Sequence, residues 1–177
     1  MINANEYGKA FFMLAEEEKI TEEILEQLLG VEDILAKNPE YCKVLDTPAI
    51  STNEKPKLID AAFSGCHKYV SNFLKMLCEK RAISQFSECV KAYRESYDDS
   101  RNIMRATAIT ARKMTERQVE ALSAKLAGIT GKNVIVENLV DEKLIGGVTL
   151  RYGGKQLDGS VRSRLDELGK RLSQTIV

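Results

Sequence analysis

The stretch that decides the fold lies near the end of the chain and reads "LIGGVTLRYGGKQLDGSVRSRLDELGKRL", from Leu144 to Leu172. Two glycine pairs flank a short alternating strand, in which Val148, Leu150 and Tyr152 share one face. After the second pair the sequence predicts a basic helix, because apolar residues recur at helical spacing. A glycine pair followed by lysine also occurs in phosphate-binding loops. The stretch therefore indicates either a nucleotide site or a hairpin that presents a helix.

The positions of the glycines disfavour the phosphate-binding loop. The pattern GxxxxGK[ST] would need a glycine where Thr149 stands and a serine or threonine where Gln156 stands. The dinucleotide pattern GxGxxG does not occur in this stretch either. Glycines on both sides of a strand are typical of turns and bulges, where the backbone needs positive φ. We therefore expect a hairpin rather than a nucleotide site.

The first hundred residues repeat apolar side chains at helical spacing. An acidic start at Thr21–Glu23 suits the positive end of a helix dipole, and Pro39 can open a short third helix. Residues 47–56 are rich in turn formers and predict a loop. A long sixth helix is expected from Ile83 to Tyr97. Six helices with short connections predict an antiparallel bundle.

In the remaining residues the period of the apolar side chains changes from helical to alternating. The segments "MRATAITAR" and "NVIVENLV" predict two strands with a helix between them. Thr115 with Gln118 resembles a capping box at the start of that helix, and Gly131 marks its end. The order strand–helix–strand–strand–helix predicts a small α/β unit. The expected fold class is α + α/β, with a six-helix bundle over residues 1–104 and a small α/β domain over residues 105–177.

The composition indicates a globular protein whose two parts differ in charge. Of its 177 residues 44% are hydrophobic and 29% are charged, which favours a folded core over disorder. Residues 1–105 carry 14 Lys and Arg against 18 Asp and Glu, whereas residues 106–177 carry 12 against 8. This difference of sign suggests two surfaces with different partners. No apolar run has the length of a membrane span, and the N-terminus lacks the pattern of a signal peptide, so we expect a cytoplasmic protein.

Side chains that could hold a metal ion or perform catalysis are sparse. Cys42, Cys66, Cys78 and Cys89 form no CxxC pair, so reduced and partly buried thiols are expected rather than a zinc site or disulfides. The single histidine, His67, lacks neighbours that would complete a metal site or a triad, and is expected to be a surface or helix-start residue. No cofactor, metal or catalytic residue is predicted.

Four segments resemble the delta subunit of F-type ATP synthases, a family that includes the mitochondrial oligomycin sensitivity-conferring protein. The strongest is "VIVENLVDEKLIGGVTLRYG", in which an apolar strand, Asp141, a glycine pair and an alternating strand ending at Arg151 follow in the family's order. "DGSVRSRLDEL" resembles the start of its last helix, "YGKAFFMLA" its first helix and "NFLKMLCEKRAISQF" its fifth. The chain departs from the family pattern at Gly8, where alanine is usual, and at Lys80-Arg81. Gly8 is expected to weaken the first helix locally by about 0.5–1 kcal/mol.

The resemblance implies a non-catalytic connector in the stator of an ATP synthase. In this family the six-helix N-terminal domain holds the N-terminal helix of an alpha subunit in a groove between its first and fifth helices. The C-terminal domain meets the C-terminal ends of the b subunits of the peripheral stalk. The implied protein occurs once per complex and lies at the cytoplasmic face of the bacterial cell membrane, peripherally, through its partners. It would couple proton-driven rotation to ATP synthesis.

The resemblance also implies where the partners bind. On the alpha-subunit side it points to Tyr7, Ala10, Phe11, Leu14, Asn72, Phe73 and Met76. On the stalk side it points to Gly147, Arg151, Asp158, Gly159, Arg162 and Arg164. Ala10 and Asn72 are the preferred alpha contacts, because a small residue lets a helix approach and a polar residue can fix its orientation. The alternative is that most of the apolar residues only pack the bundle, and that Gly147 and Gly159 are structural.

Two other functions stay open on the residues alone. A small-molecule enzyme that uses the α/β domain would need a pocket with a perturbed acid or base, and Arg162 with Arg164 could hold a phosphate. A nucleic-acid binder would use the basic C-terminal part and would bind in a strongly salt-dependent way. The failed phosphate motifs disfavour the first function. The few aromatic residues among the basic ones disfavour the second.

Overall fold

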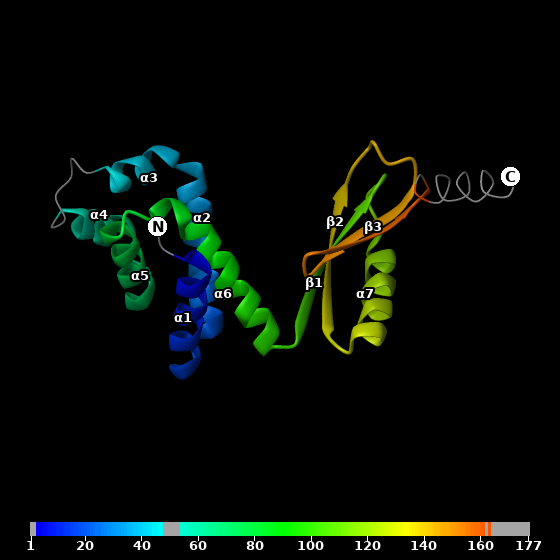
Figure 1. Cartoon of the computed structure of the whole chain (residues 1–177), viewed down its shortest axis with the longest axis horizontal. Coiled ribbons are helices and arrows are strands. Elements are labelled where there is room, and N and C mark those ends of the chain that lie inside the picture. The colour runs from blue at the N-terminus through cyan, green and yellow to red at the C-terminus, as the bar shows by residue number, and fades with distance from the viewer. Residues whose placement is uncertain (1–2, 48–53, 162, 164–177) are drawn as a thin grey trace, which may run out of the picture. The chain divides into compact units, whose positions relative to one another are not determined.

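The computed structural model describes residues 3–47, 54–161 and 163 (Figure 1). The chain divides into two compact units, Met1–Tyr97 and Asp98–Val177. Within the described ranges lie seven α-helices, one 3-10 helix and four strands. The prediction of a helix-rich protein with a small sheet near its C-terminus is therefore confirmed. That the first six helices form a single bundle stays a prediction.

The first unit is built from helices in its described residues. Their bounds are α1 Ala4–Glu17, α2 Thr21–Lys37, α3 Pro39–Asp46, α4 Lys55–Ala62, α5 Lys68–Glu79, the 3-10 helix η1 Ile83–Gln85, and α6 Phe86–Ser100. Pro39 stands in the first turn of α3, where the missing N–H of proline has no helical partner to lose. His67 caps α5, because its Nδ1 accepts a hydrogen bond from the backbone N–H of Tyr69 at 3.3 Å. The histidine is thus a helix-start residue, as predicted.

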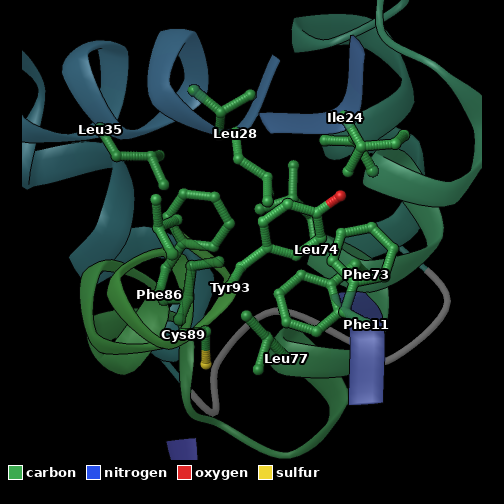
Figure 2. Packing of buried hydrophobic residues seen from close by; sticks show 14 of the residues in the cluster. Phe11, Ile24, Leu28, Leu35, Phe73, Leu74, Leu77, Phe86, Cys89 and Tyr93 are labelled. Atoms are coloured by element: carbon green, nitrogen blue, oxygen red, sulfur yellow. The ribbon is translucent and has the colours of Figure 1, made fainter. Parts of the chain in front are cut away.

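Tyr93 of α6 lies in the core of the first unit, surrounded by side chains from α1, α2 and α5 (Figure 2). The side chain is fully buried, and its hydroxyl donates a hydrogen bond to the carbonyl oxygen of Thr21 at 3.0 Å. The buried polar group is therefore satisfied. The ring centroids of Phe11 and Phe12 lie 5.7 and 5.5 Å from that of Tyr93. These tilted and edge-on aromatic pairs hold α1 against α6.

Gly8 has a packing role that its sequence context does not reveal. The residue is buried on α1 at the crossing with α6. A Cβ at this position would lie 2.3 Å from the carbonyl oxygen of Cys89 and 2.7 Å from the Cβ of Ala92. Glycine therefore lets the two helices approach closely. The predicted weakening of the first helix is therefore only part of the effect of Gly8, because glycine also permits the close packing of α1 on α6.

In its described residues, the second unit is a four-stranded sheet with a helix packed on one face (Figure 1). Its elements are β1 Ile103–Thr110, α7 Glu116–Thr130, β2 Asn133–Val140, β3 Gly147–Tyr152 and β4 Lys155–Ser160, and the strand order is β2-β1-β3-β4. β1 and β2 are parallel and α7 connects them, whereas β3 pairs antiparallel with both β1 and β4. The buried core contains Ala106, Ala108, Leu126 and Leu150. Alternate residues of the strands thus face α7.

The segment after the second glycine pair is a strand, which corrects the predicted strand–helix–strand–strand–helix order. Lys155 pairs with Tyr152 across a two-residue turn made of Gly153 and Gly154, whose φ angles are +51° and +74°. Such a turn needs positive φ at both positions and matches the twist of a hairpin. The sequence "KQLDGS" lacks strand-forming alternation, so its pairing with β3 decides its conformation. The hairpin interpretation of the glycines is confirmed; the expected last helix lies mostly outside the described residues.

The ends of α7 follow the signals in the sequence. The Thr115 hydroxyl accepts from the backbone N–H of Gln118, and the Gln118 side chain accepts from the backbone N–H of Thr115, as a capping box requires. Gly131 ends the helix in the left-handed conformation at φ +67°. No helix in the described part of the chain is long and apolar enough to cross a membrane.

Candidate functional site

Helices α1 and α5 lie side by side in opposite directions. The rings of Phe11 and Phe73 stack across them, with centroids 4.4 Å apart and planes 3° from parallel. Near the start of α5, the Tyr69 hydroxyl donates to the Glu18 carboxylate at 3.1 Å, just beyond the end of α1. The two contacts occur in opposite order along the two helices, so α1 and α5 are antiparallel. The stacked pair therefore lies between two antiparallel helices (Figure 2).

Some of the predicted alpha-side residues are buried in the core and others are exposed on the surface. Phe11 and Phe73 are buried in the core of the first unit, so for these two the packing alternative describes their environment. Ala10, Leu14 and Asn72 are exposed, and the remaining two, Tyr7 and Met76, are partly buried against the core.

One further exposed apolar residue of α1 is not among the predicted contacts. Met13 of α1 leaves 65% of its surface exposed, and Leu14 beside it leaves 39%. Met13 follows Ala10 by three positions, so the two share a helix face. The spacing from Ala10 could have identified Met13 in the sequence. Met13 was not predicted because it does not belong to the apolar stripe that contains Phe11. The apolar surface of α1 is thus wider than the predicted contact set.

The predicted stalk-side glycines are required by the β3–β4 pairing. Gly147 has φ +86°, and a Cβ there would lie 2.5 Å from the carbonyl oxygen of Gly159. A Cβ on Gly159 would in turn lie 2.9 Å from the carbonyl oxygen of Val148. Both positions exclude a side chain for reasons of backbone packing. The structural reading of these two glycines accounts for their presence.

Arg151 and Asp158 lie on the sheet face opposite α7. Their strand partners show this, because Thr149 pairs with Asp158 and alternates with Leu150, which faces the α7 core. The Asp158 carboxylate accepts from the backbone N–H of Ser160 at 2.9 Å and from the Thr149 hydroxyl at 3.3 Å. Hydrogen bonds from Ser160, with a smaller one from Thr149, lower the pKa of Asp158.

Arg151 is held in place within the same sheet face. Its Nε donates to Oε1 of Gln156 at 3.0 Å. Arg162 and Arg164, the other two predicted stalk residues, lie outside the described residues. The face also carries Ile135 and Leu139 of β2, which are 46% and 49% exposed. Neither residue is among the predicted contacts, although "NVIVENLV" places apolar residues on both faces of that strand.

The cysteines have environments that disfavour nucleophilic chemistry. Burial raises the pKa of Cys78 to about 11 and that of Cys89 to about 11. A thiol with such a pKa is protonated at neutral pH and is a poor nucleophile. Within the described ranges, no three histidine, cysteine or carboxylate side chains gather as metal ligands would.

Among the described residues, exposed apolar side chains lie on α1 and on the sheet face opposite α7, and exposed apolar patches are typical of surfaces that bind other polypeptides. The chain belongs to the ATP synthase delta (OSCP) subunit family, whose model matches residues 4–172. It is 38% identical to "ATP synthase subunit delta" of Clostridioides difficile over 180 residues, which cover 99% of each chain. It is 34% identical to the protein of the same name from Priestia megaterium, over 96% of this chain and 94% of that protein.

The fold agrees with a solved structure from a distant organism. A chain in the cryo-EM structure of the Toxoplasma gondii mitochondrial ATP synthase hexamer aligns with a TM-score of 0.72 and 20% identity, over 97% of this chain and 98% of that one. At this identity the likeness concerns the fold. Family membership makes this chain a non-catalytic subunit of the peripheral stalk of an ATP synthase.

Proposed function

We propose that this chain is the stator connector between the catalytic head and the peripheral stalk. Its N-terminal domain, residues 1–104 as a six-helix bundle, binds the N-terminal helix of an alpha subunit. Its C-terminal domain, residues 105–177, binds the C-terminal ends of the b subunits. One copy sits in each complex at the cytoplasmic face of the bacterial membrane. By holding the head against the rotor it couples proton-driven rotation to ATP synthesis.

The observation that carries the alpha-side proposal is the exposed surface along α1. Ala10 and Leu14 present apolar atoms to solvent on the flank of α1 that adjoins Phe11, the residue that stacks on Phe73 of α5. An apolar strip between two helices is the surface that an amphipathic helix covers. Burial of its apolar side would stabilise a complex by about 25 cal/mol per Å² of apolar area removed from water. Asn72, exposed on α5, can orient such a helix by hydrogen bonding.

The test is a calorimetric titration of the full chain with a synthetic peptide of roughly the first twenty residues of the alpha subunit from the same organism. Ala10→Asp places a charge in the proposed contact and should weaken binding at least about tenfold, which corresponds to about 1.4 kcal/mol. The matched control is Ala61→Asp, an exposed alanine on α4. Equal affinities for both variants would contradict the assigned groove, and absence of peptide binding to the folded wild type would contradict the alpha-side function.

A further inference from the structure

Strand β2 forms an open edge of the C-terminal sheet. In the described part of the chain the strand order β2-β1-β3-β4 gives it a strand neighbour on one side only, which is β1. The backbone N–H groups of Asn133 and Asp141 donate to the carbonyl oxygens of Asn102 and Thr110, at 2.9 Å each. Because successive residues of a strand alternate in direction, the backbone groups of the even-numbered residues 134–140 point away from β1. These outward groups are a row of donors and acceptors with which another strand can pair.

The composition of β2 favours such pairing. The sequence "NVIVENLV" is rich in β-branched residues and contains neither proline nor lysine, the residues that commonly hinder pairing at an edge strand. Ile135 and Leu139 are 46% and 49% exposed on the sheet face opposite α7. Between them on that face stands Glu137, the single charged residue of the strand. One outward group is already engaged, because the carbonyl oxygen of Val134 accepts from the Ser123 hydroxyl at 2.5 Å.

A second copy of this chain has a strand that fits this edge. In an antiparallel pair of two β2 strands the outward groups must face each other, so even-numbered residues lie opposite even-numbered ones. One register sets apolar side chains mostly against apolar ones and opposite charges against each other at both ends. Its opposed pairs are Val134–Val140, Ile135–Leu139, Val136–Asn138 and Lys132–Glu142. The neighbouring register, with Val136 opposite itself, sets Ile135 against Glu137 and loses these matches.

The matched register also places Glu137 directly opposite Glu137 of the second copy. This pair would be of the kind without hydrogen bonds between its backbone groups, in which the side chains lie closer together. Like charges directly opposite each other destabilise a strand pair. Within the described residues Glu137 takes part in no ion pair that would neutralise it. The one charge on β2 therefore stands where it opposes the register that the other side chains favour.

We infer that the outer edge of β2 is a strand-pairing surface for a second copy of this chain, and that Glu137 keeps the two copies apart. Each of the other matched pairs would stabilise a dimer through β2, and the repulsion at its centre opposes them. The free chain thereby stays available for assembly with other subunits. The inference concerns the isolated chain and does not depend on which partners occupy the two proposed binding surfaces.

Sedimentation of the full-length chain over a range of concentrations tests this inference. Glu137→Val removes the charge and supplies a strand-favouring residue. It should lower the dissociation constant for self-association at least about tenfold relative to wild type. The matched control is Gln156→Val, which adds the same side chain at an exposed position of β4, the other edge strand. The control should change the dissociation constant less than about twofold.

A second substitution tests whether the association uses the edge of β2. Val136→Pro, added to Glu137→Val, removes an outward N–H without removing a bond to β1, and should return self-association to the wild-type level. Circular dichroism checks that each variant is folded. Self-association of folded Glu137→Val no stronger than that of wild type would overturn the inference. Association that Gln156→Val matches, or that Val136→Pro leaves unchanged, would also overturn it.

Discussion

At the scale of single residues, the contacts and the exposure of a side chain depend on the packed structure and cannot be derived from its spacing in the sequence. The spacing of apolar residues identified Phe11 and Phe73 as members of helix stripes, but not that their rings stack between α1 and α5. Likewise, periodicity placed Ala10 and Leu14 on one face of the first helix. Which part of that face stays exposed depends on where α5 and α6 lie, and this is a tertiary property.

Gly8 offers a prediction in which local and tertiary effects have opposite signs. Helix propensity alone would make Gly8→Ala stabilising by roughly 0.5–1 kcal/mol. The structure predicts destabilisation by about 1–3 kcal/mol, because the new Cβ would lie 2.3 Å from the carbonyl oxygen of Cys89 and α1 would have to move. Urea unfolding of the two proteins measures the difference.

The control for this prediction is Gly30→Ala in α2. Among the described residues, no heavy atom apart from its two chain neighbours and its local helix backbone lies within 4 Å of the Cβ position of Gly30. That substitution should therefore stabilise the protein by up to about 1 kcal/mol. Stabilisation of similar size by both substitutions would show that the close approach of α1 and α6 at Gly8 does not constrain the fold.

Among the elements, those with strong local signals were predictable and those made by pairing were not. α7 was marked at both ends, by the Thr115 capping box and by Gly131. β4 was not predicted, since "KQLDGS" is polar and pairs only because Gly153 and Gly154 turn the chain back onto β3.

The β3–β4 hairpin should lose part of its stability in acid through Asp158. Its pKa is held below the ordinary value of 3.8, chiefly by the backbone N–H of Ser160. A carboxyl with a lowered folded-state pKa stabilises the fold above its unfolded-state value, and this contribution disappears as the pH falls through the folded-state value. The stability difference between wild type and Asp158→Asn should therefore shrink as the pH falls below 3.8.

Unfolding midpoints measured from neutral pH down through the acid range test this prediction. Carbon-detected NMR titration of the Asp158 carboxyl gives the same information directly, as a midpoint below 3.8. A difference between the two proteins that is independent of pH would show that the hydrogen bonds from Ser160 and Thr149 do not favour the charged form.

At the scale of the whole molecule, we propose that two separate surfaces bind two different partners. The charge totals already suggested two surfaces, since residues 1–105 are net acidic and residues 106–177 net basic. The candidate for the first surface is the exposed part of α1 with Ala10 and Leu14, and the candidate for the second is the sheet face that carries Arg151 and Asp158. A connector needs both surfaces occupied at once, because either complex alone transmits no force between head and stalk.

The measurement that tests this most directly is binding of the alpha-subunit peptide and a peptide from the C-terminal end of the b subunit together. The full chain is saturated with the alpha-subunit peptide and then titrated calorimetrically with the b-subunit peptide, and the order is reversed in a second titration. We predict a ternary complex in which each affinity changes less than about threefold when the other site is filled, since independent sites have little coupling free energy. Mutually exclusive binding, or binding of only one peptide by the folded chain, would contradict the connector.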